Sequence, residues 1–357
     1  MFLALLLPLL LKTAVSAVNV EEELLETVSQ EEGLTQEEIR QLGPMQQLQE
    51  VPLPGKIGEM IKSALEASGL LSFRSGLRTA AILLAAVLAG SILPQDSQVH
   101  RGLNLACAAA IVGACATDLH AMIGLGTETV RRIGQYAAAL VPGLCTLMAA
   151  AGCISSGASL NIFASAALNL FSSLCTSLLV PMIYALIGLS VADTALGLAP
   201  LEKLRSLMKS ICTGLLKLTV SSFTALLATV GCFSAAADAS KVKAAKIAIS
   251  GMIPMVGGAV SNASESLLNA ALMLKASVGT YGMLAVLCMF FTPFLKIGAQ
   301  YLLLKGTAAL CGLFGNQTLT GLIDKLSQAM GLVLAMTGVI CMMAIMSFAL
   351  CVHTVAS

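Results

Sequence analysis

The stretch that decides the fold class is residues 328–353, QAMGLVLAMTGVICMMAIMSFALCVH, which contains no aspartate, glutamate, lysine or arginine. A helix needs about 20 predominantly apolar residues to cross the hydrocarbon core of a bilayer. The rest of the chain has the same character, because its 357 residues are 57% hydrophobic and 11% charged. Soluble domains carry about 25% charged residues, and so large an apolar excess cannot be hidden in one soluble core. The sequence therefore predicts an all-α fold, a polytopic integral membrane helical bundle.

The predicted multi-span membrane domain covers residues 73–357. Its apolar stretches predict helices at about 77–93, 103–125, 133–153, 160–180, 182–198, 211–236, 247–274, 278–296, 298–314 and 328–353. Six to nine crossings are expected, with some shorter pieces re-entrant or paired across a break. Proline lacks the amide proton that a helix interior needs, so kinked or broken helices are predicted at Pro142, Pro181, Pro254 and Pro293.

Two segments precede this domain. Residues 1–17 resemble a secretory signal peptide, with a short apolar run followed by small residues at Val15-Ser16-Ala17. No basic residue precedes the run and Lys12 interrupts its end, so an uncleaved anchor is the alternative, although we favour cleavage. Residues 18–72 contain more than half of the 19 acidic residues and several prolines, which predicts an acidic polar head and linker.

Composition and motifs argue against several functions. No compact basic patch with interleaved aromatic residues is present, which disfavours a nucleic-acid partner. The 11 cysteines are scattered in apolar runs without a CxxC, and no histidine stands at a ligand spacing, so we expect packing roles and neither a metal nor another cofactor. A Walker-type glycine loop, HExxH, GxSxG and paired carboxylates are all missing. The sequence thus predicts no catalytic residues and a protein that is not an enzyme.

Residues 201–218 carry apolar side chains at helical spacing, with Lys203, Arg205 and Lys209 off that stripe. The pattern fits a basic amphipathic helix lying in the membrane interface, or equally a solvated helical loop packed on the bundle. These basic residues and a second group, Lys241, Lys243 and Lys246, flank the predicted span 211–236 on both sides, so the orientation stays open. Isolated polar residues near span ends are expected to be interfacial or loop residues; they are Asp118 with His120, Asp193 and Asp238.

The most unusual stretch begins at Lys246 and reads KIAISGMIPMVGGAVSNASESLLNAALMLKASVG. Proline and paired glycines allow a helix break or a very close helix contact at Pro254, Gly257 and Gly258. Beyond them, polar residues at i, i+3, i+4 and i+7 share one helix face: Asn262, Glu265, Ser266 and Asn269. We call Asn262, Glu265 and Asn269 the polar seam.

An ionised glutamate at the bilayer centre costs at least about 2.5–3.5 kcal/mol, so this seam is predicted to face protein, water or a partner. It could line or gate a pore, or dock another membrane subunit. The alternative is an interhelical hydrogen-bond network that only holds the bundle together, with Glu265 protonated.

At this segment the chain resembles the stage III sporulation protein AE family of endospore-forming bacteria. The resemblance rests on residues 253–261 (IPMVGGAVS), Glu265, residues 272–275 (LMLK), Val278-Gly279, residues 293–297 (PFLKI) and Tyr301-Leu302. The order of signal peptide, short polar head and multi-span body is similar as well, and the likeness is most specific from about 240 to 305.

The resemblance implies a non-enzymatic membrane subunit of the channel or secretion-like complex that joins mother cell and forespore during endospore formation. It further implies a multi-pass protein of the mother-cell membrane surrounding the forespore. Its implied partners are other stage III sporulation membrane proteins, a cytoplasmic ATPase and a forespore partner. The alternative function is a stand-alone small-molecule or ion transporter that uses Glu265 as its coupling residue, although no convincing internal repeat supports it.

Overall fold

The structure, a computed structural model, describes residue 76 and residues 78–91, 98–150, 154–197, 199–252, 257–314 and 316–353. Side chains are described over a smaller set, which leaves out most of residues 230–276. The predicted signal peptide (1–17) and polar head (18–72) lie outside these ranges. Within them, nearly every residue is helical.

A short helix, Arg78–Ser91, precedes the main elements. These are α4 (Gln98–Ala150), α5 (Ile154–Leu174), a π-helical turn (Cys175–Leu179), α6 (Val180–Leu196), α7 (Ala199–Met252), α8 (Gly257–Gly312) and α9 (Gln317–His353). Five helices in the described part of the chain are long and apolar enough to cross a membrane, by length and composition. The predicted class, an all-α polytopic membrane protein, is confirmed.

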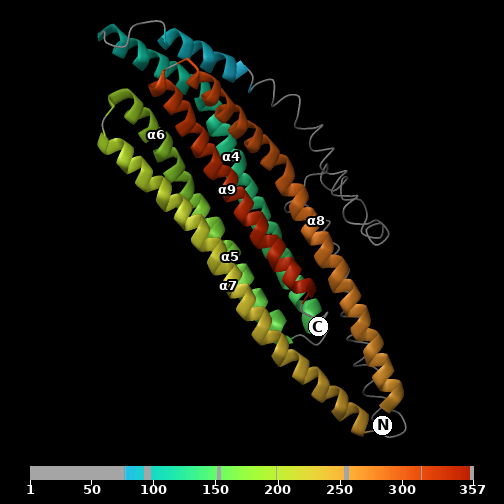
Figure 1. The fold of residues 1–357 in the computed structure, drawn as a ribbon. Coiled ribbons are helices and arrows are strands. Elements are labelled where there is room, and N and C mark those ends of the chain that lie inside the picture. The colour runs from blue at the N-terminus through green and yellow to red at the C-terminus, as the bar shows by residue number, and fades with distance from the viewer. Residues whose placement is uncertain are drawn as a thin grey trace.

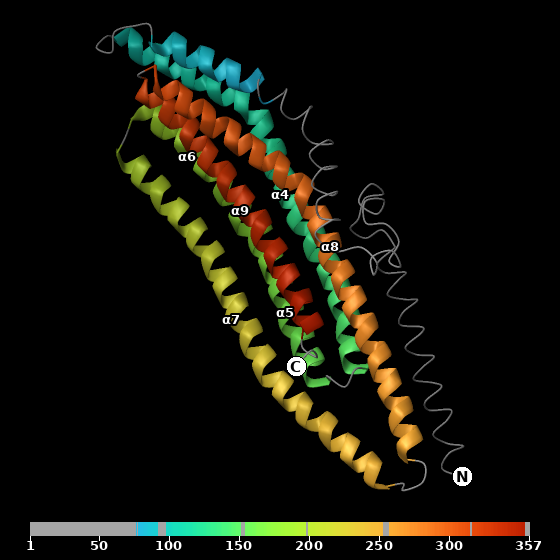
Figure 2. The ribbon, with the colours of Figure 1, turned by 45° about the vertical axis from the view of Figure 1, so that its right-hand side comes forward.

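Successive long helices run antiparallel, with α5 and α6 forming one continuous rod (Figure 1). The central helix is α9, which touches α4, α5, α6, α7 and α8. The helix α8 packs mainly along α9 and α4, whereas α7 packs along α5, α6 and α9. Figure 2 shows that the hairpin of α7 and α8 extends past the C-terminal end of α9.

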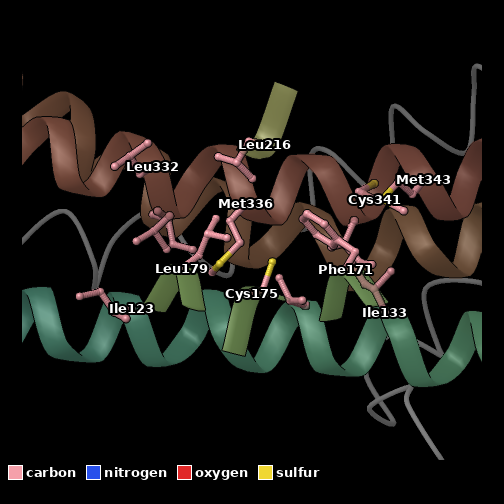
Figure 3. Packing of buried hydrophobic residues seen from close by; sticks show 14 of the residues in the cluster. Ile123, Ile133, Phe171, Cys175, Leu179, Leu216, Leu332, Met336, Cys341 and Met343 are labelled. Carbon is pink, nitrogen blue, oxygen red and sulfur yellow. The ribbon is translucent and has the colours of Figure 1, made fainter. Parts of the chain in front are cut away.

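One apolar core runs through the bundle. Figure 3 shows Ile123 and Ile133 from α4, Phe171 from α5 and Leu216 from α7 arranged around Met336 and its neighbours on α9. At Gly126 the helices α4 and α9 approach so closely that a Cβ added to this glycine would lie 2.5 Å from Val333 Cγ1 of α9. A glycine is needed there because the stiff β-branched valine has little freedom to move away.

The predicted helices 103–125 and 133–153 are wrong as separate elements, because α4 runs through both without a break. The charged residues between them had suggested a loop. They instead lie on one exposed face, where Arg131 pairs with Glu128 three residues earlier, while Val130 and Ile133 face the core. An i,i+3 pair of opposite charge stabilises a helix surface, so the polar stretch stays helical.

The prolines affect their helices in different ways. Pro142 in α4 and Pro293 in α8 lie inside continuous helices, so neither ends its helix. Pro181 follows the π-helical turn at the start of α6. The wider turn accommodates the proline ring, which would clash with a carbonyl four residues back in a regular α-helix. The break predicted at Pro181 is therefore a change of helix type within one rod.

The predicted helix 247–274 is also wrong as one element, since α7 ends at Met252 and α8 begins at Gly257. Pro254 lies between them, outside the described residues. The helices predicted at 278–296 and 298–314 are both parts of α8. Because several predicted pairs are fused, the described residues contain five candidate spans rather than the expected six to nine.

Candidate functional site

The polar seam lies on the first turns of α8. Gly257 and Gly258 begin the helix, and Asn262, Glu265 and Asn269 follow within it. A helical backbone places these three residues along one face. Their side chains lie outside the described set, so the role predicted for the seam stays a prediction.

A second polar group, which the sequence analysis did not assemble, is described in full. We call it the ionic cluster, and it lies where α6 and α8 end and α7 and α9 begin. Its members are Asp193 of α6, Arg205 and Lys209 of α7, Lys305 of α8, and Asp324, Lys325 and Gln328 of α9. We call this end of the bundle the ionic end.

The most buried ion pair of the ionic cluster joins Lys325 to Asp193. The lysine Nζ donates a hydrogen bond to Oδ2 of Asp193, and the two side chains are 20% and 9% exposed. Asp193 is therefore not isolated, contrary to the prediction, whereas its expected position at the membrane interface stays a prediction. Transfer of both charges out of water is costly, and a partner at hydrogen-bond distance offsets that cost.

A second chain of contacts links α7, α8 and α9. Lys305 of α8 pairs with Asp324 of α9, and Asp324 accepts a 2.8 Å hydrogen bond from Gln328 Nε2. The amide oxygen of Gln328 then accepts a 2.9 Å hydrogen bond from Lys209 Nζ and longer ones from Arg205. Gln328 is thus the bridge between α7 and α9.

The prediction of a separate interfacial helix at residues 201–218 needs correction, because α7 continues from this segment along the bundle without a break. Part of its polar face turns inward: Arg205 and Lys209 contact Gln328, whereas Leu204 and Ile211 are exposed. The helical period was correct, but sequence alone did not indicate which face would find a polar partner.

Short turns position the ionic cluster. Gly197 adopts a left-handed conformation (φ 62°) and its N–H donates to the carbonyl of Asp193, which ends α6. At the start of α9 the side-chain oxygen of Asn316 accepts a 3.2 Å hydrogen bond from the N–H of Leu319, as an N-cap does. The charged side chains are therefore held close to well-defined helix ends.

Two other predicted polar residues have partners within the bundle. Asp118 accepts a 2.8 Å hydrogen bond from Thr79 of the helix Arg78–Ser91, and His120 Nδ1 lies 2.7 Å from the hydroxyl of Tyr184 on α6. Both lie inside α4 rather than in a loop, so that part of the prediction is wrong. The side chain of Asp238 lies outside the described set. Among described residues, no group of three or more His, Cys, Asp and Glu side chains could hold a metal ion.

Comparison with known proteins assigns the family. The model of the family described as stage III sporulation protein AE matches residues 81–355, which include all of α4 to α9. The chain belongs to this family. The chain is similar to "Stage III sporulation protein AE" of Bacillus subtilis (strain 168), with 23% identity over 230 residues. That alignment covers 64% of this chain and 58% of the relative, less than two thirds of its length. No solved structure matches.

Membership makes this chain a stage III sporulation protein, and its fold makes it a multi-pass helical membrane protein. The match contains both the ionic cluster and the polar seam. The residues that carried the resemblance, from Ile253 to Leu302, all lie inside it. The predicted polar head does not, because the match begins at residue 81.

Proposed function

We propose that the protein is a non-enzymatic membrane subunit of a channel or secretion-like complex between mother cell and forespore. It would reside in the mother-cell membrane that surrounds the forespore. The observation that carries the proposal is the family match, because it extends over the whole described bundle rather than over one motif.

The proposed partners are other stage III sporulation membrane proteins, a cytoplasmic ATPase and a forespore partner. The sequence contains no Walker-type glycine loop, so an energy-coupled step would draw on another chain. The polar seam is the proposed docking or gating element, since it stands on the α7–α8 hairpin that reaches beyond the other helices (Figure 2).

Replacement of the glycines at the start of α8 tests this proposal in a spore-forming host. Gly257→Leu and Gly258→Leu are expected to abolish co-purification of the partner membrane proteins and to remove most heat-resistant spores. The matched control is Gly306→Leu on the same helix, where a Cβ would meet nothing within 4 Å. Immunoblots of the membrane fraction check that each variant accumulates. Normal spore yield with both glycine variants would contradict the proposal.

Glu265→Gln separates this function from a stand-alone transporter. The substitution removes the charge and preserves the shape of the side chain. A docking or packing residue should largely tolerate it, with the complex intact and sporulation near normal. A proton- or ion-coupled carrier should lose transport even though the protein is still made and inserted.

A further inference from the structure

The long helices are far longer than a bilayer is thick. At about 1.5 Å per residue, α7 with 54 residues and α8 with 56 residues are each roughly 80 Å long. The hydrocarbon core of a bilayer is about 30 Å thick. Less than half of each helix can therefore lie in hydrocarbon, and the distribution of charge decides which part does.

Charged residues divide α7 and α8 at matching distances. On α7 the stretch between Lys217 and Asp238, residues 218–237, contains no charged residue. On α8 the stretch between Lys275 and Lys296, residues 276–295, contains none either. Each is about 30 Å long as a helix, which equals the hydrocarbon thickness.

The longest uncharged stretch of the helix α4 begins after Arg132. It comprises residues 133–150 and reaches the end of the helix. The preceding residues include the exposed pair of Glu128 and Arg131. In each of the three helices the longest uncharged segment is thus about 18 to 20 residues long.

The segments of α4 and α8 lie side by side, and both lie against α9. A Cβ added at Gly282 of α8 would lie 2.4 Å from Leu140 of α4 and 3.5 Å from Phe348 of α9. One added at Gly279 would lie 2.3 Å from Val352 of α9. Their boundaries near the ionic end lie within about two helical turns of each other, because Gly126, six residues before Arg132, stands next to Ile297 of α8, beside Lys296.

We infer that the bilayer hydrocarbon surrounds only the half of the bundle that contains residues 133–150 of α4, 218–237 of α7 and 276–295 of α8. The ionic end then projects into water on one side of the membrane. The polar seam lies beyond Lys275 and projects into water on the other side. At the boundary nearer the ionic end, Arg132, Lys217 and Lys296 can then extend their charged ends toward the headgroups.

The opposite placement, with hydrocarbon around the ionic end, is physically much poorer. It would immerse the first turns of α7, where Glu202 and Lys203 are exposed, and the half-exposed Lys305 of α8. Charged side chains near the bilayer centre are costly and are usually directed to the bundle interior. In the placement inferred here, Glu265 is ten residues beyond Lys275, and this distance argues against a coupling residue at the midplane.

The inference concerns position in the membrane and does not depend on the proposed function. The placement nevertheless has one consequence for the proposed function. Leu204, Leu207 and Ile211 are exposed on α7 in the projecting half. Large apolar side chains in water are typical of surfaces that another subunit covers. The proposed complex would supply such a subunit.

Single cysteines in a cysteine-free background of the full chain test the placement. Membranes are treated with a membrane-impermeant maleimide, which reacts with thiols that meet water. Leu226 of α7 is an exposed position between the boundaries, and Leu204 and Leu313 are exposed positions toward the ionic end. Ile162 of α5 is exposed and also lies between the boundaries, because Ser172 stands beside Gly134 of the antiparallel α4 and Ile162 is ten residues earlier. We expect L226C and I162C to be protected in membranes, and L204C and L313C to be labelled.

The seam side is tested with S264C and S266C, which stand on different faces of α8. At least one of them should be labelled, and from the opposite side of the membrane to L313C, when spheroplasts and inverted vesicles are compared. Labelling after denaturation confirms that every thiol is present, and size-exclusion chromatography in detergent confirms that each variant folds. Protection of L204C together with labelling of L226C would overturn the inference, as would labelling of L313C and the seam cysteines from one side.

Discussion

Lys325 on α9 donates a hydrogen bond to Asp193 on α6, a residue 132 positions earlier in the chain. The pair fastens the start of the central helix to the end of the α5–α6 rod. Because Asp193 is buried, loss of either partner leaves a charge in a poorly solvated place.

Asp193→Ala is expected to destabilise the protein by about 2 kcal/mol, less than for a fully buried pair because Lys325 retains partial exposure. Asp193→Ala combined with Lys325→Met should recover much of that loss, since no unpaired charge remains. The measurement is thermal unfolding in detergent. Glu128→Ala, which removes an exposed ion pair, is the control and should cost less than about 1 kcal/mol. Equal effects at the two sites would contradict the role assigned to the buried pair.

Gln328→Leu is expected to loosen the first turns of α7. The substitution removes the acceptor of Lys209 and Arg205 and leaves those donors without that bond. Hydrogen exchange should become faster at residues 199–210 and stay unchanged at residues 218–229. Gln135→Leu, at an exposed position of α4, should change neither segment. A uniform increase over α7 would show that Gln328 does not act locally.

Gly126→Val should reduce stability by about 1–3 kcal/mol, because the new side chain would overlap Val333 on the central helix. Gly124 lies two residues away on the same helix, and a Cβ there meets nothing within 4 Å. Gly124→Val should therefore have little effect. Unfolding midpoints of the two variants in the same detergent make the comparison, and similar midpoints would mean that α4 and α9 are less closely packed than described.

The buried cysteines should resist thiol reagents in the folded protein. Nine of the 11 lie among the described side chains, and all nine are buried in the core. After Cys153→Ser and Cys232→Ser, an impermeant maleimide should label almost no protein in detergent and about nine thiols per chain after denaturation. Rapid labelling before denaturation would show that the bundle opens on the timescale of the reaction.

Much of the fold could be predicted from local pattern. The uncharged run 328–353 became part of α9, and the apolar stretch 77–93 coincides with the helix Arg78–Ser91. Helix ends were less predictable. The charged stretch around Glu128 and Arg131 was mistaken for a loop, because local polarity does not distinguish a loop from one wet face of a continuous helix.

The two candidate sites, the polar seam and the ionic cluster, also differ in how far the sequence predicted them. The polar seam was found because its residues recur within one helix, at a spacing that sequence displays directly. The ionic cluster was missed because it brings together residues from four helices that are far apart in the sequence. One local signal was available: Asp324, Lys325 and Gln328 stand close together in an otherwise apolar helix, and such residues in a membrane bundle usually have partners.

The sequence by itself determined that this chain is helical and apolar and belongs in a membrane, since composition and hydrophobic run length are properties of the chain alone. The tertiary structure alone decided that Lys325 meets Asp193 and that Arg205 and Lys209 turn inward. Pairings of this kind depend on which helix faces come together, and that choice is made by packing over distances that no local pattern records.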